Sequence, residues 1–161
     1  IQPILCCGKI YYFLERLIVI DYSESSKIIQ KGLMFLNEFG FEKSEICFEN
    51  SKMAGEGISF SYKSKKVDLT LDVTFWKAQL GQISTFVVLI ENDNDRLDLG
   101  DWLKEKRKEK EIPLYNSSNI QEEIFIKKFI SSFKRLCRSD LKEILEGRRW
   151  DEVPFDWGDY R

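Results

Sequence analysis

The sequence predicts an α+β fold, in which an antiparallel meander of three or four strands carries helices packed mainly on one face. The strands are predicted by residues 58–75, where apolar side chains such as Ile58, Phe60 and Tyr62 alternate with mostly polar ones. The helices are predicted on either side of this region, where apolar residues recur every three or four positions. Because a sheet with one apolar face needs a cover, we expect the helices to provide it.

The chain has 161 residues, which is enough to bury a sizeable core, and we expect a single domain spanning residues 1–161. Within it we distinguish an apolar lead-in (1–22), the core (23–147) and an acidic, aromatic tail (148–161). The formal charge of −2 gives the whole molecule no general attraction for nucleic acid or for an anionic membrane. Any electrostatic function must therefore be local.

The lead-in contains an apolar stretch, Ile10 to Ile20, whose spacing predicts a short helix. This stretch is shorter than the about 20 residues that cross a bilayer, so we expect no membrane span. The cysteines are Cys6, Cys7, Cys47 and Cys137, with no metal-binding spacing and no histidine to join them. We therefore expect reduced thiols, no metal, no cofactor and a cytoplasmic location.

A first core helix is predicted from an N-cap at Ser25 or Ser26, because the residues that follow carry a wide apolar stripe. Gly40 stands where the left-handed residue after a helix belongs, and Phe41 can fold back onto Leu36. We therefore expect this helix to end at Gly40.

The strand candidates have the bounds 45–49, 58–63, 66–76 and 83–91. Asn50 to Gly57 contains two glycines among polar residues and predicts a loop. Ser64 and Lys65 predict a tight hairpin connection between the second and third strands. The run Phe86 to Ile90 is apolar without alternation, which predicts a central strand contacted on both faces.

After the sheet, residues 91–95 interrupt all periodicity and predict a solvated loop. Residues 93–104 resemble a calcium-binding loop in acidity, but Asp98 and Lys104 replace the glycine and glutamate that such a loop needs. A helix is predicted from about Asp98 and is expected to stop at Pro113.

The most regular helix follows Asn119 and Glu122, whose spacing is that of a capping box. Ser139 is expected to cap a last short helix that ends at Gly147. The apolar face of the regular helix carries Ile126, Phe129, Ile130, Phe133, Leu136 and Cys137.

Catalytic chemistry finds little support in these residues. Because Cys137 shares the apolar face and no histidine exists to take its proton, we predict a core thiol and no catalytic residue. The chain also lacks a dinucleotide-binding, phosphate-loop or nucleophile-elbow motif. A small enzyme without histidine chemistry is kept as an alternative, because carboxylate, lysine and tyrosine chemistry needs no histidine.

The polar side of the helix 124–138 is basic, with no acid between its cations. Such a face can bind phosphates, nucleic acid or an acidic partner, although solvated lysines are common on amphipathic helices. The cations of this alternative site are Lys127, Lys128, Lys134, Arg135 and Arg138, followed by Arg148 and Arg149.

The tail combines aromatic and acidic residues at high density, either as a strap docked on its own domain or as a partner-binding patch. Trp and Tyr dominate interface hot spots, while acids steer a cationic partner, so we predict the patch. Its residues are Trp150, Asp151, Glu152, Phe155, Asp156, Trp157, Asp159 and Tyr160.

The junction 35–41, with Phe39, Gly40 and Phe41, and the later segment 99–103 resemble a large group of small uncharacterised bacterial α+β proteins. The resemblance covers about Ser25 to Gly147. Members of that group are often suspected to be immunity proteins that neutralise a toxin, which implies a cognate toxin as partner. The matching residues are helix caps and core positions, so no catalytic or binding residue is carried over.

These observations favour a non-enzymatic protein-binding module, with an immunity-type inhibitor of a bacterial toxin implied by the resemblance. The missing histidine and motifs argue against an enzyme, and the near-zero charge argues against general nucleic-acid affinity. A phosphate or nucleic-acid binder that uses the basic helix face remains the other alternative.

Overall fold

A computed structural model describes residues 5–6, 9–10, 22–51, 55–77, 84–117 and 120–153. The fold is α+β, with a five-stranded antiparallel sheet instead of the three or four strands predicted. The sheet follows chain order: β3 (Phe41–Ser51), β4 (Gly55–Ser64), β5 (Thr70–Lys77), β6 (Thr85–Glu91) and β7 (Arg96–Asp98). A separate pair comprises β1 (Leu5–Cys6) and β2 (Lys9–Ile10). The helices are α1 (Tyr22–Gly32), the 3-10 helix η1 (Leu33–Phe39), α2 (Leu99–Glu105), α3 (Glu122–Arg138) and α4 (Lys142–Leu145).

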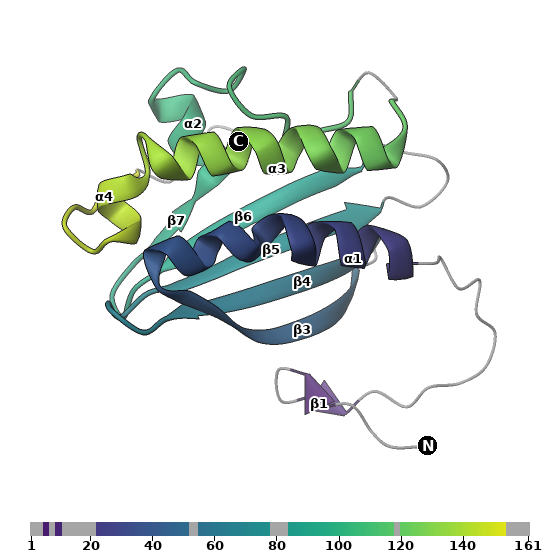
Figure 1. The fold of residues 1–161 in the computed structure, drawn as a ribbon, viewed down its shortest axis with the longest axis horizontal. Coiled ribbons are helices and arrows are strands. Elements are labelled where there is room, and N and C mark those ends of the chain that lie inside the picture. The colour runs from purple at the N-terminus through teal and green to yellow at the C-terminus, as the bar shows by residue number, and fades with distance from the viewer. Residues whose placement is uncertain are drawn as a thin grey trace, which may run out of the picture.

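α1 and α3 lie side by side in front of the sheet, and α2 lies beside β6 and β7 (Figure 1). The strands turn their large apolar side chains to one face, because side chains alternate along a strand. Phe75 pairs with Phe86 across β5 and β6, and both rings are buried. Phe129 of α3 stacks on Phe86 with 3.7 Å between ring centroids, and Phe133 continues the stack. This aromatic column fixes α3 on the sheet, as its apolar stripe predicts.

β3 and β4 are longer than their apolar residues indicate. β3 begins at Phe41, and β4 begins within the loop expected from Asn50 to Gly57. Polar residues join the ladder there, since Asn50 pairs with Glu56 and strand pairing uses main-chain groups. The connection after Ser64 is not tight, because β5 begins only at Thr70. In β6, Val87 and Leu89 are half-buried, so the expected burial of both faces is wrong for these two side chains.

The first core helix starts at Tyr22, before both predicted caps. Ser25 lies inside it, buried, and donates a 2.6 Å hydrogen bond to Glu122 Oε2. Gly32 lies against Ile130 of α3, where a Cβ would come within 2.4 Å of the Ile130 Cδ1 atom. Gly40 ends η1 with φ of 84°, which confirms the predicted left-handed cap. The helix expected from residue 10 is wrong at its start, which belongs to β2, and residues 11–20 lie outside the described residues.

The segment between the sheet and α3 differs most from expectation. β7 pairs with β6 directly after the predicted solvated loop, and Asp98 then caps α2 by accepting from Gly100 and Asp101 N–H groups. α2 ends at Glu105, well before Pro113, and Arg107 has φ of 56°. A positive φ at arginine turns the chain out of the helix, so residues 106–117 form a loop.

α3 and α4 confirm the two last helices, but their caps are different. α3 begins at Glu122, which is therefore not the third helical residue that a capping box needs, and Asn119 lies outside the described residues. The Ser139 hydroxyl donates to the carbonyl of Arg135 and caps no helix. Gly147 follows α4 with φ of 69°, as its predicted position requires.

Candidate partner-binding surface

Residues 106–117, which follow α2, form a loop that we call loop 106–117. Different parts of this loop contribute to two polar regions of the surface. Its far end is fixed to the sheet, because Phe86 N–H donates to the Leu114 carbonyl and Asn116 N–H donates to the Ser84 carbonyl. Tyr115 thereby lies opposite Thr85 as an extension of the β6 edge. The loop is therefore held against the sheet at Leu114 and Asn116.

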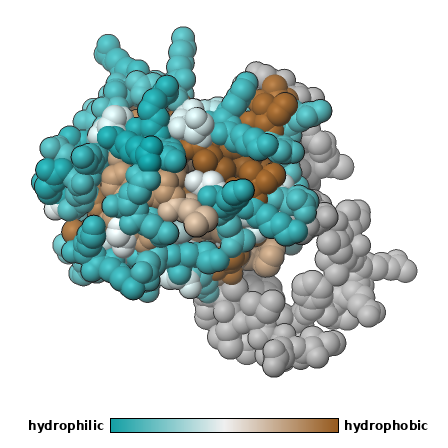
Figure 2. Space-filling model, in the orientation of Figure 1, coloured by the Kyte–Doolittle hydropathy of each residue, from teal (hydrophilic) through white to brown (hydrophobic). Residues whose placement is uncertain are grey.

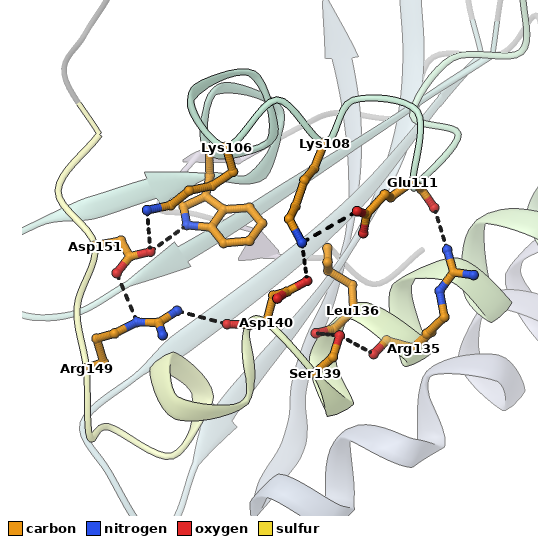
Figure 3. Close-up of polar contacts among 10 residues, drawn as sticks. Lys106, Lys108, Glu111, Arg135, Leu136, Ser139, Asp140, Arg149 and Asp151 are labelled. Carbon is orange, nitrogen blue, oxygen red and sulfur yellow. Dashed lines mark hydrogen bonds and ion pairs between the residues drawn. The ribbon is translucent and has the colours of Figure 1, made fainter.

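The start of the loop belongs to a cluster that we call the latch (Figure 3). Its residues are Trp102, Lys106, Lys108, Asp140, Arg149 and Asp151. Asp151 is its centre. The carboxylate accepts a 2.9 Å hydrogen bond from Trp102 Nε1 and lies 3.3 Å from Lys106 Nζ and 3.0 Å from Arg149 Nε. Its side chain is 13% exposed, so these contacts form away from most of the solvent. The latch borders a cavity of about 380 Å³.

The latch holds Asp151 in its ionised form. Burial raises the pKa of Asp151, but the hydrogen bonds from Trp102 and Lys106 and the charge of Arg149 outweigh it, and the pKa is lowered overall. The neighbouring Trp150 donates a 2.9 Å hydrogen bond to Asp95, which lowers the pKa of that carboxyl. Trp150 and Asp151, which are the first aromatic and the first acidic residue of the tail, therefore contact their own domain.

These contacts change the interpretation of the predicted partner patch. Trp150 packs partly buried against the core, and Asp151 is engaged in the latch, whereas Glu152 is exposed. The other predicted patch residues, which are Phe155, Asp156, Trp157, Asp159 and Tyr160, lie outside the described residues. The described start of the tail is a strap that is fastened to α2, α4 and the loop before β7.

A chain of polar contacts leads from the latch to α3. Arg149 donates to the Asp140 carbonyl at 2.9 Å, and the Asp140 carboxylate lies 2.8 Å from Lys108 Nζ. Lys108 also lies 3.5 Å from the Glu111 carboxylate, while the Glu111 carbonyl accepts a 3.1 Å hydrogen bond from Arg135. Figure 3 shows that Glu111 turns its carboxylate toward Lys108 and its carbonyl toward Arg135.

The rest of the loop lines an open hollow of about 930 Å³, which we call the α3 groove. Lys128 and Arg135 line it from α3, with Ser131 and Ser132 between them. The opposite wall is formed by residues 109–115 and Ser117 of the loop. The groove therefore combines cations, hydroxyls and the partly apolar wall of the loop.

The groove carries a small excess of positive charge. Within the described part of the chain, Lys110 and Lys128 have no ion pair, and the Arg135 guanidinium donates to the Glu111 carbonyl. The Glu111 carboxylate faces Lys108 but shares that lysine with Asp140, so its charge is only partly compensated. Glu109 is the other acid on the wall, so three cations stand against two acids.

Lys127 and Arg138 of the predicted basic face are paired with acids, which corrects the expectation that these two cations are uncompensated. Lys127 pairs with Glu123, four residues earlier, and Arg138 donates two hydrogen bonds to Glu38, which lies 100 residues away in sequence. The bond from Arg138 lowers the pKa of the Glu38 carboxyl. Lys134 lies over the Phe35 ring, 5.8 Å from its centroid.

The two last cations of the predicted face are also paired with acids. Arg148 pairs with Glu146, and Arg149 lies 3.0 Å from the Glu143 carboxylate in addition to its contact with Asp151. Of the seven predicted cations, Lys128 and Arg135 are the two that line the groove.

The described residues offer no arrangement typical of catalysis. Cys137 is fully buried, and burial raises the pKa of its thiol, which confirms the predicted core thiol. Cys47 is also buried, and the side chains of Cys6 and Cys7 lie outside the described part. Among the residues described, no group of histidine, cysteine, aspartate and glutamate is placed to hold a metal ion.

The residues that sequence analysis missed lie mostly in the latch and the loop. Trp102 and Asp140 are separated from Asp151 by helices and turns, so no local spacing connects them. Lys106 and Lys108 belong to a charged run in which acids and bases interleave, and that run gave no sign of which cations stay unpaired. Tyr115 could have been singled out, because an aromatic residue after Pro113-Leu114 interrupts a polar stretch.

Comparison of the chain with protein-family models, with curated proteins and with solved structures found no match. Within the described ranges, none of the helices has the length and apolar character needed to cross a membrane. The latch and the groove are therefore the features that bear on the function of the protein.

Proposed function

We propose that this protein is a non-enzymatic protein-binding module and that its partner docks in the α3 groove. The observation that supports this proposal is the contrast between paired and unpaired charge. Around the latch, acids and bases satisfy one another, whereas Lys110, Lys128 and Arg135 keep their charges beside the groove. Unpaired cations beside an apolar wall are groups that a partner can still engage.

The groove has the composition of a protein interface. Tyr115 is 62% exposed, and Pro113 lies half-buried beside it on the same wall. Tyrosine and arginine are enriched among the residues that dominate binding energy, and partly apolar surfaces with a polar rim are typical of interfaces. The hollow is open, so it suits a projecting segment of another protein better than an enclosed metabolite.

A cognate toxin is the partner class that the resemblance to bacterial immunity-type proteins implies, with both proteins meeting in the cytoplasm. A phosphate or nucleic-acid ligand is favoured by one observation, which is the row Lys128, Ser131, Ser132 and Arg135 on a single helix face. Its positive charge is confined to a few residues, however, while a backbone-tracking surface needs a longer basic path. We therefore argue for the protein partner.

The proposal is tested by photo-cross-linking in the cell that makes the protein. A photoreactive residue at Ser131, which is exposed in the groove, should give a cross-linked species of one discrete added mass. The same residue at Glu45, which is exposed on the edge strand β3, is the control and should give none. The cross-linked partner, purified and mixed with the protein, should bind with an affinity that Arg135→Ala lowers at least fivefold.

Absence of a discrete species at Ser131, or an equally strong one at Glu45, would contradict docking in the groove. A cross-link to RNA or DNA would replace the protein-binding proposal by the nucleic-acid alternative.

A further inference from the structure

We infer that the groove binds an extended acidic segment, with main-chain pairing to Tyr115. This inference rests on the proposed function, because it specifies the chemistry of the partner segment in the same groove. Three independent features of the groove support it: the unpaired cations on α3, the edge of the β-bridge at Tyr115, and the hydroxyls between the cations.

The cations on α3 can meet an acid of an extended segment. Lys128 and Arg135 are seven residues apart, which on a helix rising 1.5 Å per residue is about 10.5 Å along the axis. Side chains alternate between the two faces of an extended chain, so acids three residues apart point to opposite faces. One of two such acids therefore faces Lys128 or Arg135, whichever side of the segment meets α3.

The loop wall offers an unpaired main-chain edge. Leu114 C=O and Asn116 N–H point to β6, where they are bonded to Phe86 and Ser84. In an antiparallel ladder the residue between two such groups directs its own N–H and C=O to the opposite side. Tyr115 therefore presents both groups away from β6, and neither has a hydrogen-bond partner among the described residues. An extended segment can add to this edge as a further short strand.

The floor between the cations is hydroxylated. Ser131 and Ser132 lie between Lys128 and Arg135 in sequence, and both line the groove. Hydroxyl groups donate to carboxylate and carbonyl oxygens alike, so they can serve the main chain as well as the acids of an extended segment. A basic segment would instead place its charges against Lys110, Lys128 and Arg135, which excludes it from the groove.

The chain itself supplies a suitable probe sequence. Residues 155–160 read FDWGDY, in which Asp156 and Asp159 would lie on opposite faces of an extended peptide, so that one of them can face the cations. A fluorescein-labelled peptide of this sequence is compared with the same peptide in which both aspartates are asparagine. We expect the acidic peptide to bind the full-length protein and the asparagine peptide to bind at least tenfold more weakly, measured by fluorescence anisotropy at low salt.

Two variants of α3 locate the binding. Lys128→Ala should weaken the acidic peptide at least threefold, because an unpaired cation is lost. Lys127→Ala is the matched control on the same helix, and it should leave the affinity unchanged because Lys127 is already paired with Glu123. Equal binding of the two peptides, or equal effects of the two variants, would overturn the inference.

Competition separates the sources of negative charge. Displacement of the peptide by a heptauridylate RNA at lower concentration than by unlabelled peptide would also overturn the inference in favour of a nucleic acid. The inference and the proposed function fail separately. A cross-linked protein partner at Ser131 without binding of the acidic peptide contradicts only the acidic chemistry. Acidic-peptide binding without a cross-linked partner contradicts only the cellular function.

Discussion

The latch and the α3 groove use different parts of loop 106–117 and the same kinds of residue, with opposite results. In the latch, Asp151 is surrounded by Trp102, Lys106 and Arg149, and its charge is satisfied within the chain. In the groove, Lys128 keeps its charge without a partner among the described residues. The comparison teaches that charge content alone does not identify a binding surface. What matters is whether the fold has already used the charge.

Figure 2 shows the face of the molecule that carries α1 and α3. That face is mostly hydrophilic, with hydrophobic residues reaching the surface between the polar ones. Met34 and Ile124 are exposed apolar residues of the described part, and both belong to the helical layer. Scattered apolar exposure of this kind is normal for a protein surface, so it does not compete with the groove as a site.

The largest expected effect concerns the helix on which both regions depend. Phe133 is fully buried in the aromatic column of α3, which carries Arg135 at the groove and ends next to Asp140 at the latch. Phe133→Ala should therefore lower the free energy of unfolding by about 3–5 kcal/mol, because it leaves a cavity in the core. Urea denaturation measures this. Ile124→Ala, which truncates an exposed residue of the same helix, should cost less than about 1 kcal/mol.

The inner face of α3 was predictable because its signal is local. Phe129 and Phe133 follow helical spacing. The end of η1 has a local signal as well, because Gly40 adopts the left-handed conformation easily. β7 was missed because it contains only three residues, of which Leu97 alone is apolar. Its strand character comes from pairing with β6, which is information that the segment does not carry.

The sites were less predictable, since their residues meet only through the fold. Five cations of the predicted basic face belong to α3, but Glu38 neutralises Arg138 from 100 residues away in sequence. Likewise, Asp151 was assigned to a partner patch from the composition of the tail, whereas its indole donor, Trp102, belongs to α2. Sequence composition thus indicated where charges gather, and tertiary contacts decided which of them remain free.

The second prediction breaks the latch. Asp151→Ala removes the acceptor of Trp102 and leaves Lys106 without its counter-ion, so stability should fall by about 1–2 kcal/mol. For a domain of this size the thermal midpoint should drop by about 2–8 °C. Calorimetry checks both values against Glu152→Ala, the exposed neighbouring acid, which should change the midpoint little. Equal midpoints for the two variants would show that Asp151 does not fasten the strap.

The third prediction uses pH to release the latch without changing its shape. The folded pKa of Asp151 lies below its unfolded value of about 3.9, so its stabilisation is fully present above that value and is lost as the pH falls through the folded pKa. The groups facing it are Lys106, Arg149 and Trp102, with Lys108 and Asp140 beyond them. Of these, only Asp140 is another carboxyl group, and it is unchanged in the variant used for comparison.

The measurement is the difference in thermal midpoint between the protein and its Asp151→Asn variant. This difference should be constant between pH 7 and pH 5 and should shrink below about pH 4, since both proteins then carry a neutral side chain at position 151. A difference that grows as the pH falls would mean that the folded pKa is raised, and it would contradict an ion-paired Asp151.

The smallest expected effect concerns the groove and completes the comparison. Lys128→Ala removes a cation that has no ion pair in the described structure, so the free energy of unfolding should change by less than about 0.5 kcal/mol. Arg138→Ala is the matched control, because it removes a cation that makes two hydrogen bonds to Glu38, and exposed bidentate pairs contribute up to about 1 kcal/mol. Paired denaturation curves should therefore rank Arg138→Ala as the more destabilising variant. A larger loss for Lys128→Ala would mean that the fold already uses Lys128, and the groove would then no longer differ from the latch.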